Sequence, residues 1–165
     1  MTVISEARGK RGVFSRGIAS GIHIGAPPER VWDVLADFAR FHEWNPFLVE
    51  AEGRAEPGTR LKLRFKLPGG GMEMVFRPTM LVCERGEMLR WRGRFGMPGV
   101  FDGVHTFRLT PRDGGTDVLQ SERFSGALVP FMHKIITASE RGFADLNTAL
   151  KSHVEPNSVP PPAGA

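Results

Sequence analysis

Two side chains capable of acid–base chemistry, His105 and Glu122, lie in neighbouring stretches of alternating polar and apolar residues. Such alternation is typical of strands that bury one face. A connection of four residues, 112–115, places His105 opposite Glu122 and Phe107 opposite Gln120, with all four facing inward. A connection of five residues turns Glu122 outward instead. We expect the four-residue connection, because it buries the apolar residues of the second strand.

A histidine beside a carboxylate in a dry wall has three possible roles. Histidine titrates near neutrality, and a carboxylate fixes its tautomer and favours its protonated form. The pair is therefore a polar handle for a ligand, an acid–base pair suited to aldol cyclisation or dehydration, or a structural pair satisfied within the core. His105 and Glu122 are the candidate catalytic residues, and the three roles stay open at this level.

Other reactive groups do not form recognisable sites. His23, His42, His133 and His153 show no metal-ligand spacing, and Cys83 is the single cysteine. We therefore expect no metal site, no internal disulfide and a reducing compartment. No phosphate loop, nucleophile elbow or dinucleotide fingerprint is found. The sequence predicts a protein with no cofactor.

The elements that must position the pair are several strands and one long helix. A short strand at 19–25 precedes a helix at about 28–37 and a second short helix at 38–42. The second helix ends at Trp44-Asn45-Pro46, because the residue before proline avoids helical angles. The remaining alternating patterns predict a turn at Gly69-Gly70-Gly71 and strands at 61–66, 72–77, 79–84, 89–92, 100–110 and 116–125.

The last predicted element is a helix from Pro130 to about His153. Its apolar stripe faces a partner surface, whereas Asn147 is among the residues expected to face water. Gly142 removes bulk at the middle of this helix. The stripe consists of Met132, Ile136, Ser139, Phe143, Leu146 and Leu150.

A curved sheet covered by one helix seldom fills the enclosed space. Methionine and phenylalanine recur at the inward positions, and methionine adapts its shape to varied apolar partners. We therefore interpret the interior as an apolar cavity for a small hydrophobic ligand, with the loop at 93–99 as its mouth. The expected ligand-binding residues are Phe65, Met74, Phe76, Trp91, Phe107, Gln120, Met132, Ile136, Ser139 and Phe143.

Several motifs resemble the START-like, or SRPBCC, superfamily over about residues 18–153. They are the run from Ile22 to Trp32 (IHIGAPPERVW), Trp44-Asn45-Pro46, Phe101-Asp102-Gly103 through His105-Thr106-Phe107, and Arg141-Gly142-Phe143 with the segment 147–151. The resemblance implies the α+β helix-grip fold: an antiparallel sheet of about six to seven strands around a long C-terminal helix, with two short helices after the first strand. It also implies a lipid, polyketide or aromatic metabolite as ligand, and the chain is most similar to the bacterial polyketide cyclase-like branch.

The length of 165 residues fits one domain. We expect an N-terminal arm at 1–16, a ligand-binding domain at 17–154 and a disordered proline-rich tail at 155–165. The chain lacks an apolar run long enough to span a bilayer and an apolar signal core, so we expect no stable membrane insertion and a cytoplasmic location. A monomer and a homodimer are both compatible with the sequence.

The net charge is +4 and the isoelectric point is about 9.8. The basic residues alternate along strands and lack a recognition motif, so we expect no nucleic-acid partner. Arg90, Arg92 and Arg94, beside Lys62, Arg64 and Lys66, are expected to form a basic outer sheet face. This face is either solvated or the contact for an anionic partner or a membrane. A further alternative is a protein-interaction domain of the chaperone-partner type, for which the same face would be the contact.

Overall fold

A computed structural model describes residues 12–66 and 73–155. Most of the predicted arm at 1–16, the predicted turn at Gly69-Gly70-Gly71, Met72, and the tail beyond Glu155 lie outside the described residues. The elements are β1 (Ser15–Ile24), α1 (Pro28–Ala36), the 3₁₀ helix η1 (Phe38–Glu43), β2 (Leu48–Glu52), β3 (Lys62–Lys66), β4 (Glu73–Phe76), β5 (Thr79–Glu84), β6 (Met88–Phe95), β7 (Phe101–Arg112), β8 (Gly115–Ser125), the 3₁₀ helix η2 (Val129–Phe131) and α2 (His133–Val154).

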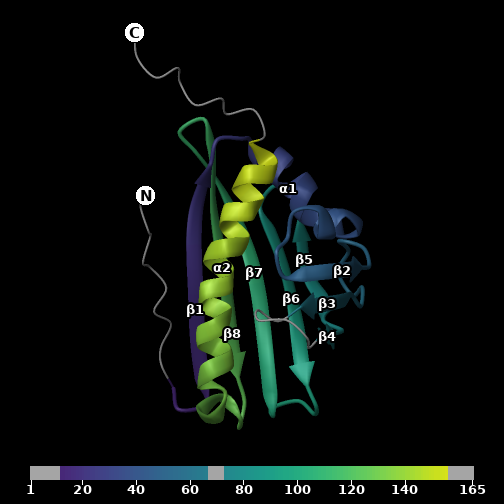
Figure 1. Cartoon of the computed structure of the whole chain (residues 1–165), viewed down its shortest axis with the longest axis vertical. Helices are drawn as coiled ribbons and strands as arrows, with labels where there is room; N and C mark the ends of the chain where they lie inside the picture. The colour runs from purple at the N-terminus through teal and green to yellow at the C-terminus, as the bar shows by residue number, and fades with distance from the viewer. Residues whose placement is uncertain (1–11, 67–72, 156–165) are drawn as a thin grey trace.

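The strands form two antiparallel sheets. The larger sheet has the order β1-β8-β7-β6-β5 and the smaller one β2-β3-β4. In Figure 1, α2 runs along β1 and β8 at one edge of the larger sheet, and the smaller sheet lies beside β5 and β6 at the other edge. The α+β helix-grip fold with two short helices after the first strand is confirmed. Its described strands number eight in two sheets, rather than six to seven in one.

The unpredicted strand is β2, and a bulge explains why its pattern was hidden. The β2–β3 register shifts between Leu48 and Glu50, so Leu48 and Ala51 are both buried although three positions separate them. A bulge adds a residue to one strand and breaks the two-residue alternation. The preceding turn is built by Asn45, whose Oδ1 accepts hydrogen bonds from the backbone N–H groups of Phe47 (2.9 Å) and Leu48 (3.0 Å).

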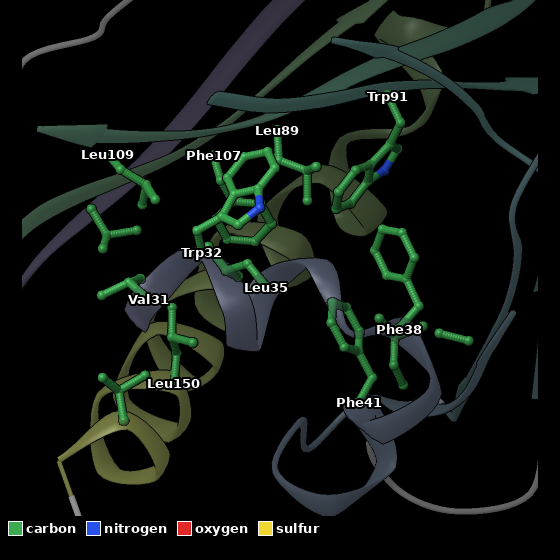
Figure 2. Close-up of a cluster of buried hydrophobic side chains, with 14 of the residues drawn as sticks. Val31, Trp32, Leu35, Phe38, Phe41, Leu89, Trp91, Phe107, Leu109 and Leu150 are labelled. Atoms are coloured by element: carbon green, nitrogen blue, oxygen red, sulfur yellow. The ribbon is translucent and has the colours of Figure 1, made fainter. Parts of the chain in front are cut away.

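The main core lies between the short helices and the larger sheet. Proline suits the first turn of α1, where its missing N–H has no intrahelical partner. Val31, Trp32 and Leu35 then recur on one face of α1 and are buried. Figure 2 shows these side chains, with Phe38 and Phe41 of η1, directed towards Leu89, Trp91, Phe107 and Leu109 of the sheet and Leu150 of α2.

Helix α2 begins three residues later than predicted. Pro130 lies in η2, and the α-helix starts at His133. Ile136, Phe143 and Leu150 are buried as expected. Asn147 was expected to face water, and this is wrong. Its side chain is 1 % exposed, and its Nδ2 donates to the backbone oxygen and Oγ of Ser20, both at 3.2 Å. Asn147 lies one turn beyond Phe143 on the same side of α2. The buried face of the helix therefore includes a polar residue besides the apolar stripe.

One carboxylate, Glu155, ties the C-terminal end of α2 to the residue after β1, and a second, Asp117 of β8, contacts His23 of β1. Lys151 Nζ donates to the backbone oxygen of His23 (2.8 Å) and to Glu155 (2.9 Å), and Glu155 also accepts from the Gly25 N–H. Burial alone raises the pKa of Glu155, but the hydrogen bonds from Gly25 and Lys151 lower it below the ordinary value. A hydrogen bond with His23, supported by Arg112, lowers the pKa of Asp117.

These lowered pKa values predict that acid destabilises the fold. A carboxylate with a lower pKa in the folded state stabilises the protein above its unfolded pKa, and this contribution is lost as the pH falls. We expect the melting temperature to drop between roughly pH 5 and pH 3. Glu155→Gln should reduce the free energy of unfolding at pH 7 by about 1 kcal/mol and flatten this pH profile.

Circular dichroism melts across this pH range measure the effect. Glu140→Gln is the matched control, because Glu140 lies on the same helix with an exposed side chain. A Glu155→Gln profile parallel to that of the wild type would contradict the role assigned to Glu155.

Candidate functional site

The predicted pair is positioned by the longest ladder of the sheet. His105 pairs with Glu122 and Phe107 with Gln120 between β7 and β8, so the predicted register is confirmed. His105 Nδ1 lies 3.6 Å from Glu122 Oε2, and the side chains are 11 % and 20 % exposed. This separation exceeds a hydrogen bond. The oxygens of the Glu122 carboxylate therefore still have capacity for a hydrogen-bond donor.

Aromatic side chains from three elements contact the His105 ring. It stacks on Trp91 of β6 with ring centroids 4.7 Å apart and planes 4° apart. It also contacts Phe107 of β7 at 4.9 Å and the edge of Phe143 of α2 at 5.0 Å. Gln120 Nε2 lies 3.3 Å from His105 Nε2. With the amide donating, the imidazole carries its proton on Nδ1, which faces Glu122.

Two buried side-chain oxygens near this ring have no hydrogen-bond partner within the described part of the chain. They are Gln120 Oε1 and Asn147 Oδ1. Gln120 pairs in register with Ser20, the residue that Asn147 contacts, so both amides lie over neighbouring positions of the β1–β8 ladder. An unsatisfied buried acceptor costs about 1–3 kcal/mol. The buried amide oxygens of Gln120 and Asn147 can therefore each still accept a hydrogen bond.

Two paired glycines next to Glu122 leave the backbone of the inner face without side chains. Gly93 of β6 pairs with Gly103 of β7, and both share the inward parity of Trp91. A Cβ on Gly103 would lie 2.6 Å from Glu122 Oε1, and a Cβ on Gly93 would lie 3.9 Å from the Phe76 ring. Sequence reasoning assigned Gly93 to a loop, whereas β6 continues to Phe95. Extending the alternation from Trp91 would have revealed the position.

Seven of the ten expected ligand-binding residues belong to two apolar clusters that both contact His105. Phe65 and Phe76 pack edge to face at 5.8 Å beside the main core, on the side of Trp91. Met132, Ile136 and Phe143 belong to a second cluster under α2. His105 contacts Trp91 of the first group and Phe143 of the second, so it joins them. The buried members are Trp91, Phe107, Gln120, Ile136 and Phe143, and the half-buried ones are Phe65, Met74, Phe76, Met132 and Ser139.

Two positions differ in detail from the expectation. Ser139 donates its hydroxyl to the Ile135 backbone oxygen of its own helix at 3.0 Å. The space above Gly142 holds the Phe47 ring, 3.5 Å from where a Cβ would stand. Gly142 therefore accommodates a side chain of the protein itself.

Two hollows lined by described residues lie away from this face. One of about 390 Å³ lies between the start of β1 and η2, and one of about 200 Å³ lies beside β1, β7 and β8. Neither involves the expected ligand-binding residues. The enclosed cavity remains a prediction from the sequence, and the structure shows a partly covered apolar face.

The expected basic outer face is divided between the two sheets. Lys62 and Arg64 lie in the smaller sheet and pair with acids there: Lys62 with Glu50 (3.0 Å) and Glu52 (2.7 Å), and Arg64 with Glu50 and Glu73. In the larger sheet, Arg90 donates to Thr106 at 3.1 Å, and Arg94 Nε lies 3.4 Å from Asp102. The two basic runs are not one continuous surface.

Among the described residues, no group of three or more histidine, cysteine or acidic side chains is placed to hold a metal ion. Burial raises the pKa of the Cys83 thiol, and the charge of Glu56 raises it further, which leaves little thiolate at neutral pH. Over the same residues, none of the helices has the length and apolar character required to cross a bilayer.

A family model described as polyketide cyclase / dehydrase and lipid transport matches residues 17–155. No curated protein matches the chain. Similar solved structures include the Zhui aromatase/cyclase from Streptomyces sp. R1128, with a TM-score of 0.69, 18 % identity, and coverage of 91 % of this chain and 99 % of that one.

Two further similar structures show the same fold. The protein Ara h 8.0201 has a TM-score of 0.64 and 16 % identity, with coverage of 87 % and 99 % of the two chains. The di-domain aromatase/cyclase BexL from the BE-7585A biosynthetic pathway has a TM-score of 0.72 and 14 % identity over 88 % of this chain. The chain spans about half of BexL, 52 % of its length.

The contact between Phe47 and Gly142 predicts the effect of adding a methyl group there. The Cβ would stand at ordinary contact distance from the Phe47 ring, so Gly142→Ala adds helix propensity without a clash. We expect it to stabilise the fold by about 1 kcal/mol. Ala144→Gly, at an exposed position of the same helix, should destabilise it by a similar amount. Chemical denaturation measures both, and a destabilised Gly142→Ala variant would contradict the described packing.

Proposed function

Because the chain belongs to the polyketide cyclase / dehydrase and lipid transport family, whose model matches residues 17–155, we propose that it binds a planar hydrophobic molecule bearing a hydroxyl group. The match also confirms the resemblance to the START-like superfamily that the sequence motifs indicated. The proposed site is the partly covered inner face of the larger sheet, beside His105, Gln120 and Glu122.

The observation that carries the proposal is the unpartnered Gln120 amide oxygen. Gln120 is fully buried, and its Oε1 has no donor within the described residues. A hydroxyl can donate to this oxygen. It can also accept if the Gln120 amide turns to place its N–H groups towards the ligand. A ligand hydroxyl therefore removes the free-energy cost of the unsatisfied Gln120 oxygen, which the ligand-free protein retains.

The apolar surroundings favour a flat ring system. Trp91 and His105 lie parallel, and Phe107 and Phe143 border the same imidazole. Aromatic rings gain from offset stacking and edge contacts beyond the area that they bury. The backbone of Gly103 accommodates the Glu122 carboxylate, and the Phe76 ring lies at contact distance from the position of a Cβ on Gly93, so a carboxylate and an aromatic ring border this part of the inner face. Two similar proteins are described as aromatase/cyclases, which is consistent with an aromatic ligand.

A second candidate is cofactor-free catalysis of cyclisation or dehydration. It is favoured by Glu122, a half-buried carboxylate that lies beside His105 and against the backbone of Gly103. In this reaction, Glu122 removes a proton from the carbon next to a ligand carbonyl. The electron pair of that C–H bond forms an enolate, to whose oxygen the Nδ1–H of His105 donates. In cyclisation, the enolate carbon attacks a second ligand carbonyl, whose oxygen takes the proton from Glu122; in dehydration, the enolate expels a β-hydroxyl group, which leaves as water with that proton.

The proposal also covers the domain bounds, the cellular location and the oligomeric state. We propose a ligand-binding domain at 17–154, preceded by an arm and followed by a tail, in a cytoplasmic protein that acts without nucleic acid as a monomer or homodimer. Support comes from the single thiol and the absence of a recognition motif in the sequence.

Binding of 2-naphthol and 2-methoxynaphthalene tests the proposal. The two probes share a flat ring system, and only the first can donate a hydrogen bond. We expect the wild type to bind 2-naphthol about tenfold more tightly, and Gln120→Met to abolish this preference. Isothermal titration calorimetry measures both affinities.

Thr148→Ala is the matched control, because Thr148 Oγ1 donates to the backbone oxygen of Ala144 on the exposed side of α2. It should keep the wild-type preference. Equal affinity of the wild type for both probes, or a preference that survives Gln120→Met, would rule out the Gln120 contact.

The catalytic candidate makes a separate prediction. Wild-type protein should accelerate exchange of the α-protons of 2-tetralone for deuterium, followed by NMR in heavy water. Glu122→Gln should lose this acceleration while still binding 2-naphthol, because only the base is removed. Exchange at the same rate with wild type and Glu122→Gln would leave binding alone as the function.

A further inference from the structure

Six of the seven large apolar side chains that are exposed among the described residues gather in three segments. These segments are 12–16, 94–102 and 126–135, which together are called the apolar end below. The seventh, Val75, lies on β4 of the smaller sheet. The six are Val13, Phe14, Phe95, Met97, Phe131 and Ile135, and Phe131 is the most exposed, at 81 %.

Backbone hydrogen bonds hold the three segments together. The N–H of Gly126 donates to Phe14 at 3.1 Å, and that of Ala127 donates to Gly99 at 2.9 Å. In Figure 1, the start of β1, the connection between β6 and β7, and the start of α2 all lie at the lower end of the molecule. The exposed apolar side chains thus form one end of the fold. Apolar patches of this kind mark interaction sites more often than chance exposure does.

The charges at the apolar end are mainly positive. Its three segments contain Arg16, Arg94 and Lys134, besides His133, and one acidic residue, Asp102. Asp102 accepts a hydrogen bond from the Gly99 N–H at 3.0 Å and lies 3.4 Å from Arg94 Nε. The acid is therefore already paired inside the apolar end, and the surface offered to a partner is cationic.

The apolar end is continuous with the interior. Phe101 stacks on Phe124 at 5.4 Å, and both pack in the second cluster together with Met132 and Phe143. Phe143 in turn contacts His105. A hollow of about 390 Å³ opens at the same end between Val13, Arg16 and Val129. An apolar partner surface here would adjoin the cluster whose Phe143 contacts His105.

We propose that the apolar end docks reversibly on an anionic lipid bilayer. Apolar side chains on separate connections would enter the interface, while Arg16, Arg94 and Lys134 would contact the headgroups. A symmetric dimer through this end would place the same cations of two copies together, which opposes association. A bilayer that contains anionic lipid complements both the apolar side chains and the charge.

Vesicle co-sedimentation of the full chain tests this proposal. We expect binding to phosphatidylcholine vesicles that contain about 30 % phosphatidylglycerol, and weaker binding at high salt or without the anionic lipid. The double variant Phe14→Ser/Phe131→Ser should lower the bound fraction about fivefold or more. Lys134→Glu should weaken binding to the anionic vesicles alone.

Val75→Ser is the matched control, because it removes an exposed apolar side chain elsewhere and should leave binding unchanged. Circular dichroism establishes that every variant is folded. The proposal is overturned if wild type does not bind anionic vesicles, or if Val75→Ser loses binding equally. It is also overturned if sedimentation velocity shows a dimer without vesicles that Phe14→Ser/Phe131→Ser disrupts, since the apolar end would then be a self-interface.

Discussion

The register between β7 and β8 is the constraint on which the rest of the site depends. A two-residue turn, Asp113-Gly114, connects the strands, and both residues have positive φ angles, 45° and 76°. Such turns match the twist of paired strands and fix which residues face each other. A slip by one residue would move His105, Phe107, Gln120 and Glu122 to the opposite face. The chemistry of the interior is thus decided at a hairpin remote from it.

The helix and the smaller sheet then divide the inner face. Helix α2 lies along β1 and β8 and is held by Asn147 and Lys151, so it covers one side of the larger sheet. The other side is bordered by Phe65 and Phe76 of the smaller sheet. His105 lies between these two apolar groups and contacts both. The polar side chains of His105, Gln120 and Glu122 lie within an otherwise apolar face. A ligand that forms hydrogen bonds with them can therefore bind in only a few orientations.

Much of the fold was predictable because alternation and helical spacing are properties of the local sequence. The β7–β8 register was predicted by choosing the connection that buries the apolar residues of β8, and the helix-grip architecture was predicted from the motifs. Three features were not predictable for identifiable reasons. The bulge at Leu48 hid β2, the amide of Asn147 is buried only because Ser20 lies opposite it, and Gly93 resembled a loop residue although it lies in a strand. Each depends on a tertiary neighbour that periodicity does not encode.

Intermolecular nuclear Overhauser effects with bound 2-naphthol measure most directly where a flat hydroxyl-bearing molecule lies in the protein. We expect contacts from the ring protons to Trp91 and Phe143 and from the hydroxyl side to the Gln120 amide. Contacts confined to the hollow beside Val13 and Val129, with none to Trp91 or Gln120, would contradict this expectation.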